Sequence, residues 1–244
     1  MSERTLAIFD LDGTITRRDT LLPYLGGFLW RHPRRWWRLP LCLPPVARYL
    51  ATNRDRGVLK GAIIQRLLGG LTRVQLAGWS RAYTARLLRR GVYAEALQCI
   101  AAHRRAQAHL VLLSASPDLY VPHIAQALGF EECICTELRW HSDGTLEGTL
   151  ASANRRGAEK ARWVAILLAE QMPLLSYAYG NSPADLEHLS MVSAGTFVNG
   201  SALRLSGRPN VHAVRWRQHG SASPCDPVPG ATGQDVTYRR PEAN

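Results

Sequence analysis

The stretch LAIFDLDGTIT, residues 6–16, decides the fold of this chain. Its first four residues are apolar, which predicts a short buried β-strand. Asp10 and Asp12 follow at the end of that strand, and Gly13 lets the chain turn sharply. In an open α/β sheet, ligands bind beyond the carboxyl ends of the strands. Two carboxylates at such an end could hold a divalent cation and attack an electrophile. A strand followed by an ordinary Asp-Gly turn is the alternative interpretation.

The segment FDLDGTIT, residues 9–16, resembles the first motif of the haloacid dehalogenase superfamily. Members of this superfamily are mostly Mg²⁺-dependent phosphohydrolases that pass through an aspartyl-phosphate. The resemblance implies that Asp10 is the nucleophile, and that Asp12 protonates the leaving alcohol and then activates water. It places Gly13 and Thr14 at the substrate. The implied fold is α/β, a Rossmann-like doubly wound parallel sheet with an all-helical cap inserted after the first strand.

A second apolar run, residues 108–113, predicts another buried strand. It ends in Ser114-Ala115-Ser116-Pro117, which resembles the second motif of the superfamily. There a hydroxyl and the next backbone N–H bind a phosphate oxygen. The resemblance assigns these roles to Ser114 and Ala115. Ser116 is expected to cap the helix that follows.

The segment NRRGAEKARWV, residues 154–164, opens a predicted helix and resembles the third motif. In that motif a lysine neutralises the nucleophilic aspartate and the phosphoryl group, which implies this role for Lys160. A single helical lysine is usually a solvated one. The chain nevertheless uses arginine almost throughout, and Lys60 and Lys160 are its only lysines. That bias favours a selected role for Lys160, because arginine cannot replace a compact ammonium at such a site.

The segment GNSPAD, residues 180–185, follows a predicted strand over residues 174–179 and resembles the fourth motif, G-D-x-x-x-D. Asn181 stands where aspartate is the commoner residue. An amide oxygen can ligate Mg²⁺, but it is neutral, so the metal site loses one negative charge. The resemblance implies a Mg²⁺ site formed by Asp10, the backbone carbonyl of Asp12, Asn181 and Asp185.

The order of predicted elements indicates three parts. Residues 1–16 and 107–205 are expected to form the core domain, residues 17–106 the helical cap, and residues 206–244 a disordered basic tail. The predicted cap helices cover residues 21–30, 39–52, 58–68, 74–89 and 94–106. Residues 132–140 and 145–150 are expected to pair as a hairpin about the turn Ser142-Asp143-Gly144. Residues 195–200 are expected to form the last strand.

The composition indicates which partners and which cellular location to expect. The formal net charge of the 244 residues is +11, which favours anionic partners. Five cysteines without a C-x-x-C pair indicate neither a disulfide framework nor a zinc site, and Cys133 and Cys135 are expected to be core residues. The chain goes straight into its first strand, so no signal peptide is expected, and no apolar run is long enough to span a membrane. A cytoplasmic location is predicted.

The segment FLWRHPRRWWRL, residues 28–39, interleaves tryptophan with arginine. Tryptophan favours the membrane interface and arginine favours anionic headgroups, which suggests peripheral contact with the inner face of a membrane. Inward packing of the tryptophans beside water-facing arginines is the alternative interpretation. Stacking of single-stranded nucleic acid on the tryptophans is a weaker third possibility.

Together these patterns predict a Mg²⁺-dependent phosphomonoester phosphatase that acts through an aspartyl-phosphate. The substrate is expected to be a small phosphorylated metabolite such as phosphoserine, or a lipid headgroup phosphate such as phosphatidylglycerophosphate. The alternative is a non-catalytic protein of the same fold that binds anionic lipid or nucleic acid through its Arg/Trp-rich cap.

Overall fold

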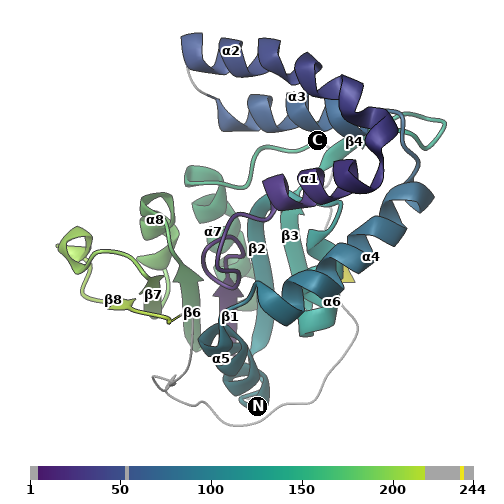
Figure 1. Cartoon of the computed structure of the whole chain (residues 1–244). Coiled ribbons are helices and arrows are strands. Elements are labelled where there is room, and N and C mark those ends of the chain that lie inside the picture. Colours follow the sequence, from purple (N-terminus) through teal and green to yellow (C-terminus); the bar gives the residue numbers. More distant parts are fainter. Residues whose placement is uncertain (1–4, 53–54, 218–236, 239–244) are drawn as a thin grey trace.

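The computed structural model describes residues 5–52, 55–217 and 237–238, and a parallel sheet forms its centre (Figure 1). The strands of this sheet are β1 (Thr5–Phe9), β2 (His109–Pro117), β3 (Glu132–Thr136), β6 (Leu175–Gly180), β7 (Ala194–Val198), β8 (Val211–Val214) and β9 (Thr237–Tyr238). Their order is β8-β7-β6-β1-β2-β3-β9, and every neighbouring pair is parallel. Because β1 lies between β6 and β2, Asp10 leaves the sheet at its centre.

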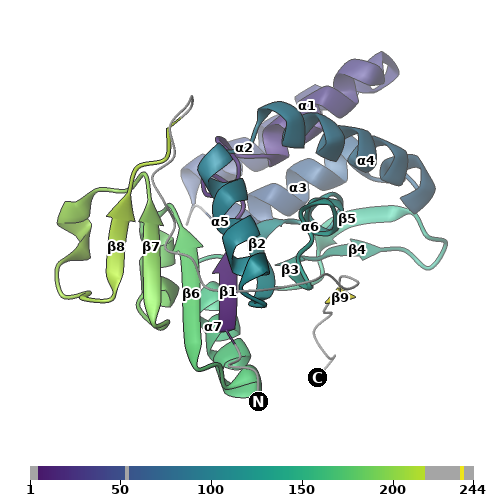
Figure 2. The ribbon, with the colours of Figure 1, turned by 90° about the horizontal axis from the view of Figure 1, so that it is seen from below.

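Helices cover both faces of the sheet, as the prediction of a doubly wound fold requires (Figure 2). Helices α5 (Ala94–Arg105) and α6 (Val121–Leu128) lie on one face, and α7 (Ala158–Gln171) and α8 (Leu186–Leu189) on the other. Side chains of a strand alternate between the two faces. Ala7 and Phe9 accordingly pack in the core cluster that contains α5 and α6, whereas Leu6 and Ile8 pack with α7 and α8. The predicted α/β fold is confirmed.

The segment between β1 and α5 forms the cap. It contains α1 (Leu21–Arg31), a 3₁₀ segment η1 (Pro33–Cys42), α2 (Leu43–Ala51), α3 (Arg56–Leu68) and α4 (Arg73–Arg90). The single helix predicted over residues 39–52 is wrong in its first part, because Pro40 lies in the 3₁₀ segment and α2 begins only at Leu43. Proline suits the first turn of a helix but not its interior. Helix α5, predicted as part of the cap, packs against β2 of the sheet.

The predicted hairpin is shorter than expected. It consists of β4 (Leu138–Trp140) and β5 (Leu146–Leu150), which pair antiparallel. Residues 132–136, predicted as part of its first arm, instead form β3 of the main sheet. Helix α3 of the cap packs against β5. Leu146 donates its backbone N–H to the Leu71 carbonyl oxygen at 2.8 Å, and the Gly70 N–H donates to the Leu146 oxygen at 2.9 Å. The hairpin therefore supports the cap.

The residues after the predicted last strand also belong to the fold. A 3₁₀ turn, η3 (Ala202–Leu205), leads to β8, which pairs with β7. Trp216 is buried, and the centre of its ring lies 6.0 Å from that of the Tyr93 ring. The backbone N–H of Trp216 donates to the Asn199 side-chain oxygen at 2.9 Å. The prediction of a disordered tail is wrong for residues 206–217. Residues 218–236 and 239–244 of the predicted tail lie outside the described residues.

The cysteines agree with the prediction only in part. Cys133 and Cys135 are buried in β3, as expected. Cys99 of α5 is disulfide-bonded, which the cysteine pattern did not predict. Within the described ranges no helix has the length and apolar character needed to cross a membrane.

We expect Trp216→Ala to lower the free energy of unfolding by about 3–5 kcal/mol, because it leaves a cavity between Tyr93 and Tyr179. Urea denaturation measures this change. Trp30→Ala is the control, since the Trp30 side chain is 77% exposed and its loss should cost under about 0.5 kcal/mol. Equal effects of the two substitutions would contradict a structural role for residues 206–217.

Candidate active site

A cavity of about 150 Å³ lies at the carboxyl edge of the sheet, beneath the cap. Six residues predicted from sequence line it: Asp10, Asp12, Ala115, Lys160, Asn181 and Asp185. Other lining residues come from the cap and from the loop before α7: Asp19, Leu21, Arg56, Lys60, Asn154 and Arg156. Ser116 and Ser182 complete the lining. Three further predicted residues, Gly13, Thr14 and Ser114, are not part of it. The structure thus brings together residues from five separate stretches of the chain.

A buried ion-pair cluster forms the floor of the cavity. The Lys160 Nζ lies 2.6 Å from Asp10 Oδ1 and 2.9 Å from Asp185 Oδ1, and all three side chains are buried. Burial raises the pKa of Asp10 to about 6, because the nearby ammonium of Lys160 offsets only part of the lost hydration. Burial acts the same way on Asp185, but Lys160, His188 and the Ser182 hydrogen bond together outweigh it and hold the pKa of that carboxyl well below its usual range. Lysine is therefore the shared counter-ion of two carboxylates.

Gly13 and Thr14 support this floor from below. Gly13 has φ +79°, and a Cβ atom there would come within 2.0 Å of the Asn181 amide nitrogen. Both the backbone conformation and the close approach therefore require glycine. The Thr14 hydroxyl donates to Asp10 Oδ2 at 3.0 Å, so both oxygens of Asp10 are held. In this conformation the two residues orient Asp10 and Asn181, and their predicted contact with substrate stays a prediction.

Asp12 is held by three hydrogen bonds. Its Oδ1 accepts from the Thr20 N–H at 2.8 Å and the Thr20 hydroxyl at 2.6 Å, and its Oδ2 accepts from the Ser116 hydroxyl at 2.6 Å. Burial raises the pKa of Asp12 above its ordinary value, although the bonds from Ser116 and Thr20 lower it in part. A raised pKa favours the protonated form of a carboxyl group, which is the form that a general acid needs.

Ser116 was predicted as a helix cap, and that prediction is wrong. Strand β2 continues to Pro117, and α6 begins only at Val121 with Tyr120 at its N-cap. Ser116 therefore sits at the end of a strand, where it contacts Asp12. Ser114 is fully buried, and its hydroxyl oxygen accepts the Ser116 N–H at 3.1 Å. Alternation along the strand would have signalled that Ser114 and Ser116 point the same way.

The residues present fit a magnesium ion. Two carboxylates and the Asn181 amide supply hard oxygen donors, which Mg²⁺ prefers. Asp10 and Asp185 share the single ammonium of Lys160, and a bound cation would compensate the remaining negative charge. The Asp12 carboxylate accepts hydrogen bonds from Thr20 and Ser116, and the predicted ligand from this residue is its backbone carbonyl. Across the described part of the chain no cluster of three His, Cys, Asp or Glu side chains forms a metal site.

The cap contributes Lys60, which sequence reasoning noted but did not assign. Its Nζ donates to the Ala115 carbonyl oxygen and to Asn154 Oδ1, the latter at 2.8 Å. Burial lowers the pKa of Lys60 to about 8. Helix α3 thereby reaches across the cavity to the end of β2. Arg56, one helical turn earlier, lines the same cavity.

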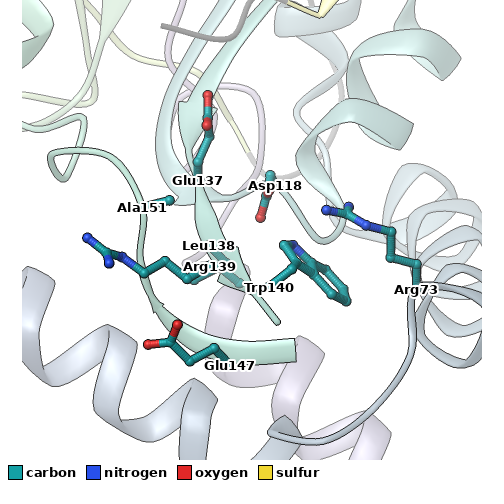
Figure 3. A pocket seen from close by; sticks show the side chains of 8 residues that line it. All are labelled: Arg73, Asp118, Glu137, Leu138, Arg139, Trp140, Glu147 and Ala151. Carbon is teal, nitrogen blue, oxygen red and sulfur yellow. The ribbon is translucent and has the colours of Figure 1, made fainter. Parts of the chain in front are cut away.

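A second cavity, of about 480 Å³, lies between the hairpin and α4 and holds none of the predicted residues (Figure 3). Asp118 and Trp140 face each other there, and the Arg73 guanidinium lies 4.0 Å from the centre of the Trp140 ring. Glu137, Arg139 and Glu147 also line it. Charges of both signs lie close together in this cavity.

Comparison with known proteins tests the predicted family. The family model of haloacid dehalogenase-like hydrolases matches residues 7–190. The chain belongs to this family. The match spans Asp10, Ser114, Lys160 and Asp185, so all four predicted motifs lie within it. The prediction of the superfamily is confirmed, and the protein is a hydrolase of the haloacid dehalogenase type.

Relatives and structures agree with this membership. Protein CicA of Caulobacter vibrioides is 32% identical over 78% of this chain and 83% of its own length. A probable phosphatase of Mycobacterium tuberculosis is 31% identical over 80% of this chain and 69% of its own length. The structure of a probable phosphoserine phosphatase from Vibrio cholerae has a TM-score of 0.65 at 13% identity and covers 88% of this chain and 62% of that one. The fold is thus that of the phosphoserine phosphatase-like hydrolases.

We expect Ser116→Ala to shift the pH dependence of turnover. The Ser116 hydroxyl lowers the Asp12 pKa, so its removal should raise that pKa and move the pH limb set by Asp12 to higher pH. Steady-state rates against pH measure the shift, and Ser190→Ala is the control, because the Ser190 hydroxyl bonds only within α8 to Leu186. An unchanged profile would contradict the coupling between Ser116 and Asp12.

Proposed function

We propose that this hydrolase is a Mg²⁺-dependent phosphomonoester phosphatase with Asp10 as its nucleophile. The observation that carries the proposal is the buried Lys160 ammonium, 2.6 Å from a carboxylate at the centre of the sheet edge. Without this cation a carboxylate and a phosphate dianion would repel each other in a partly dry site. The probable phosphatase among the relatives supports the same reaction class.

The chemistry has two steps. In the first, an Asp10 oxygen attacks phosphorus and forms an acyl phosphate, while Asp12 gives its proton to the departing alkoxide. In the second, Asp12 takes a proton from water, which attacks phosphorus, and the bond to Asp10 breaks with release of inorganic phosphate. Lys160 stabilises negative charge on the transferring group in both steps. Mg²⁺, when bound by Asp10, Asn181 and Asp185, would supply further charge neutralisation.

The substrate-binding roles of Gly13, Thr14, Ser114 and Ala115 remain part of the proposal. The Ala115 backbone lines the cavity, and the Ser114 hydroxyl would have to leave the Ser116 N–H to reach a phosphate oxygen. Backbone N–H groups at the end of β2 are the more direct donors in the present conformation.

The substrate is proposed to be a phosphomonoester whose alcohol part carries a second acidic group. Arg56, Lys60 and Arg156 line the cap side of the cavity, opposed by Asp19. Phosphoserine offers a carboxylate to the arginines and an ammonium to Asp19. Phosphatidylglycerophosphate offers a phosphodiester to the same arginines. A cytoplasmic location, with either a soluble metabolite or a headgroup at the inner membrane face as substrate, belongs to this proposal.

We expect Asp10→Asn to lower phosphate release by at least about 1,000-fold, because an amide is not a nucleophile. A panel that includes phosphoserine and micellar phosphatidylglycerophosphate is assayed with Mg²⁺ and with EDTA. Asp143→Asn, in the exposed hairpin turn, is the control. Retention of more than a few per cent of activity by a folded Asp10→Asn protein would refute Asp10 as nucleophile, and EDTA-resistant turnover would refute the metal requirement.

We expect Asn181→Asp to lower the Mg²⁺ concentration for half-maximal rate by about tenfold, because it restores a charged ligand. Asn154→Asp is the matched control: it adds the same charge to the cavity lining, beside Lys60 and away from the Asp10–Asp185 pair. If both substitutions lowered the requirement equally, a direct ligand role for residue 181 would be excluded.

A further inference from the structure

The outer side of the cap exposes an unusual set of apolar side chains. The Trp30, Trp36 and Trp37 side chains are 77%, 47% and 64% exposed. No residue of η1 or α2 is buried. The alternative interpretation, that these tryptophans pack inward, is therefore wrong. We call this surface the cap face; its apolar members are Trp30, Trp36, Trp37, Leu39, Leu41, Leu43 and Leu50.

The cap face is held in place by polar contacts, so its exposure is a feature of the folded chain. The Trp36 indole N–H donates to the Leu29 carbonyl oxygen at 2.9 Å. The Arg35 guanidinium donates to the Leu67 oxygen at 3.1 Å, and Arg38 donates to the Gly69 oxygen at 3.1 Å. These bonds tie η1 to α1 and α3, while the tryptophan rings and the leucines stay in contact with water.

Charge on this segment has one sign. Residues 30–50 contain five arginines and no aspartate or glutamate. Arg34 and Arg48 are exposed among the apolar side chains. The Arg38 guanidinium lies 5.3 Å from the centre of the Trp37 ring, so cation and aromatic ring are presented together. The surface therefore combines apolar area with positive potential.

We propose that the cap face binds the surface of an anionic lipid bilayer. Tryptophan rings favour the headgroup level of a membrane, exposed leucines favour the boundary with the acyl chains, and arginines attract anionic headgroups. A second copy of the chain fits less well, because five arginines would meet five arginines. A nucleic acid would use the arginines and tryptophans but leave the exposed leucines in water.

A groove continues the cap face between α2 and α3. Its volume is about 670 Å³, and Pro44, Pro45, Tyr49, Val58 and Leu59 supply most of its apolar lining. Arg48 and Arg66 lie at the same groove, together with one acidic residue, Asp55. It gives part of an acyl chain an apolar surface beside positive charge, so the groove and the cap face suit the same occupant.

Membrane docking is independent of the proposed chemistry. No apolar member of the cap face lines the cavity at Asp10. On α3, Lys60 lines that cavity, whereas Val58 and Leu59 line the groove. The two functions therefore use different sides of one helix, and each can be lost while the other persists.

Co-sedimentation of the full chain with vesicles tests the proposal. The vesicles are pure phosphatidylcholine, or phosphatidylcholine with phosphatidylglycerol, at low and at high salt. We expect binding to the anionic vesicles that weakens as salt screens the arginines. Trp30→Ser/Trp37→Ser should weaken this binding by about tenfold or more. Arg34→Gln/Arg48→Gln should weaken it by about thirtyfold.

The matched control is Val74→Ser/Leu203→Ser, which also replaces two exposed apolar side chains, outside the cap face. It should bind vesicles like the native protein. All variants should hydrolyse a soluble phosphomonoester at the native rate, so loss of docking is distinguished from loss of the proposed activity.

Three results would overturn the proposal. The first is no binding to anionic vesicles at low salt. The second is equal loss in the control variant. The third is a different partner. In that case vesicles do not bind, and the native protein instead forms a concentration-dependent dimer or binds single-stranded oligonucleotide. Trp30→Ser/Trp37→Ser then abolishes that dimer or that binding.

Discussion

The contact of Lys160 with Asp10 and Asp185 is the interaction on which the rest of the structure depends. Two carboxylates at neighbouring strand ends, both buried, would repel each other strongly in a medium of low polarity. A single ammonium within 2.9 Å of both carboxylates offsets that repulsion. Loss of one partner would leave an uncompensated buried charge, which is costly. The start of α7 must therefore lie opposite the ends of β1 and β6.

Packed aromatic side chains form the layer beneath the site. Phe9 stacks on Tyr179 with ring centres 4.3 Å apart, and the Tyr179 hydroxyl lies 2.7 Å from His103 Nε2. Burial lowers the pKa of His103 to about 4, so this histidine stays neutral and adds no charge under Asp10. The Trp216 ring packs against the Tyr179 ring at the edge of this layer. Close packing of this kind would hold the proposed nucleophile, Asp10, in position before substrate arrives.

The inner and outer sides of the cap carry different kinds of side chain. Its inner side is polar and cationic, with Arg56 and Lys60 over the cavity. Its outer side is apolar and cationic, with Trp30 and Trp37 exposed. One helix, α3, contributes to both, because residues that differ by one or two positions point in different directions around a helix. The proposed substrate contacts and the proposed membrane contacts therefore use different residues of the same insertion.

The local sequence pattern determined much of the fold and part of the candidate site. An apolar run ending in Asp10 predicted the central strand, and the order of motifs predicted the doubly wound sheet. It also predicted six of the residues that line the cavity, because strand ends of a parallel sheet must meet at one edge. Only the tertiary structure showed that Ser116 and Lys60 belong to the site. Their contacts, with Asp12 and with the end of β2, join residues 104 and 55 positions apart in the chain, which no local periodicity records. The same holds for Trp216 and for the outward tryptophans of the cap, since burial depends on what packs against a segment and not on its composition.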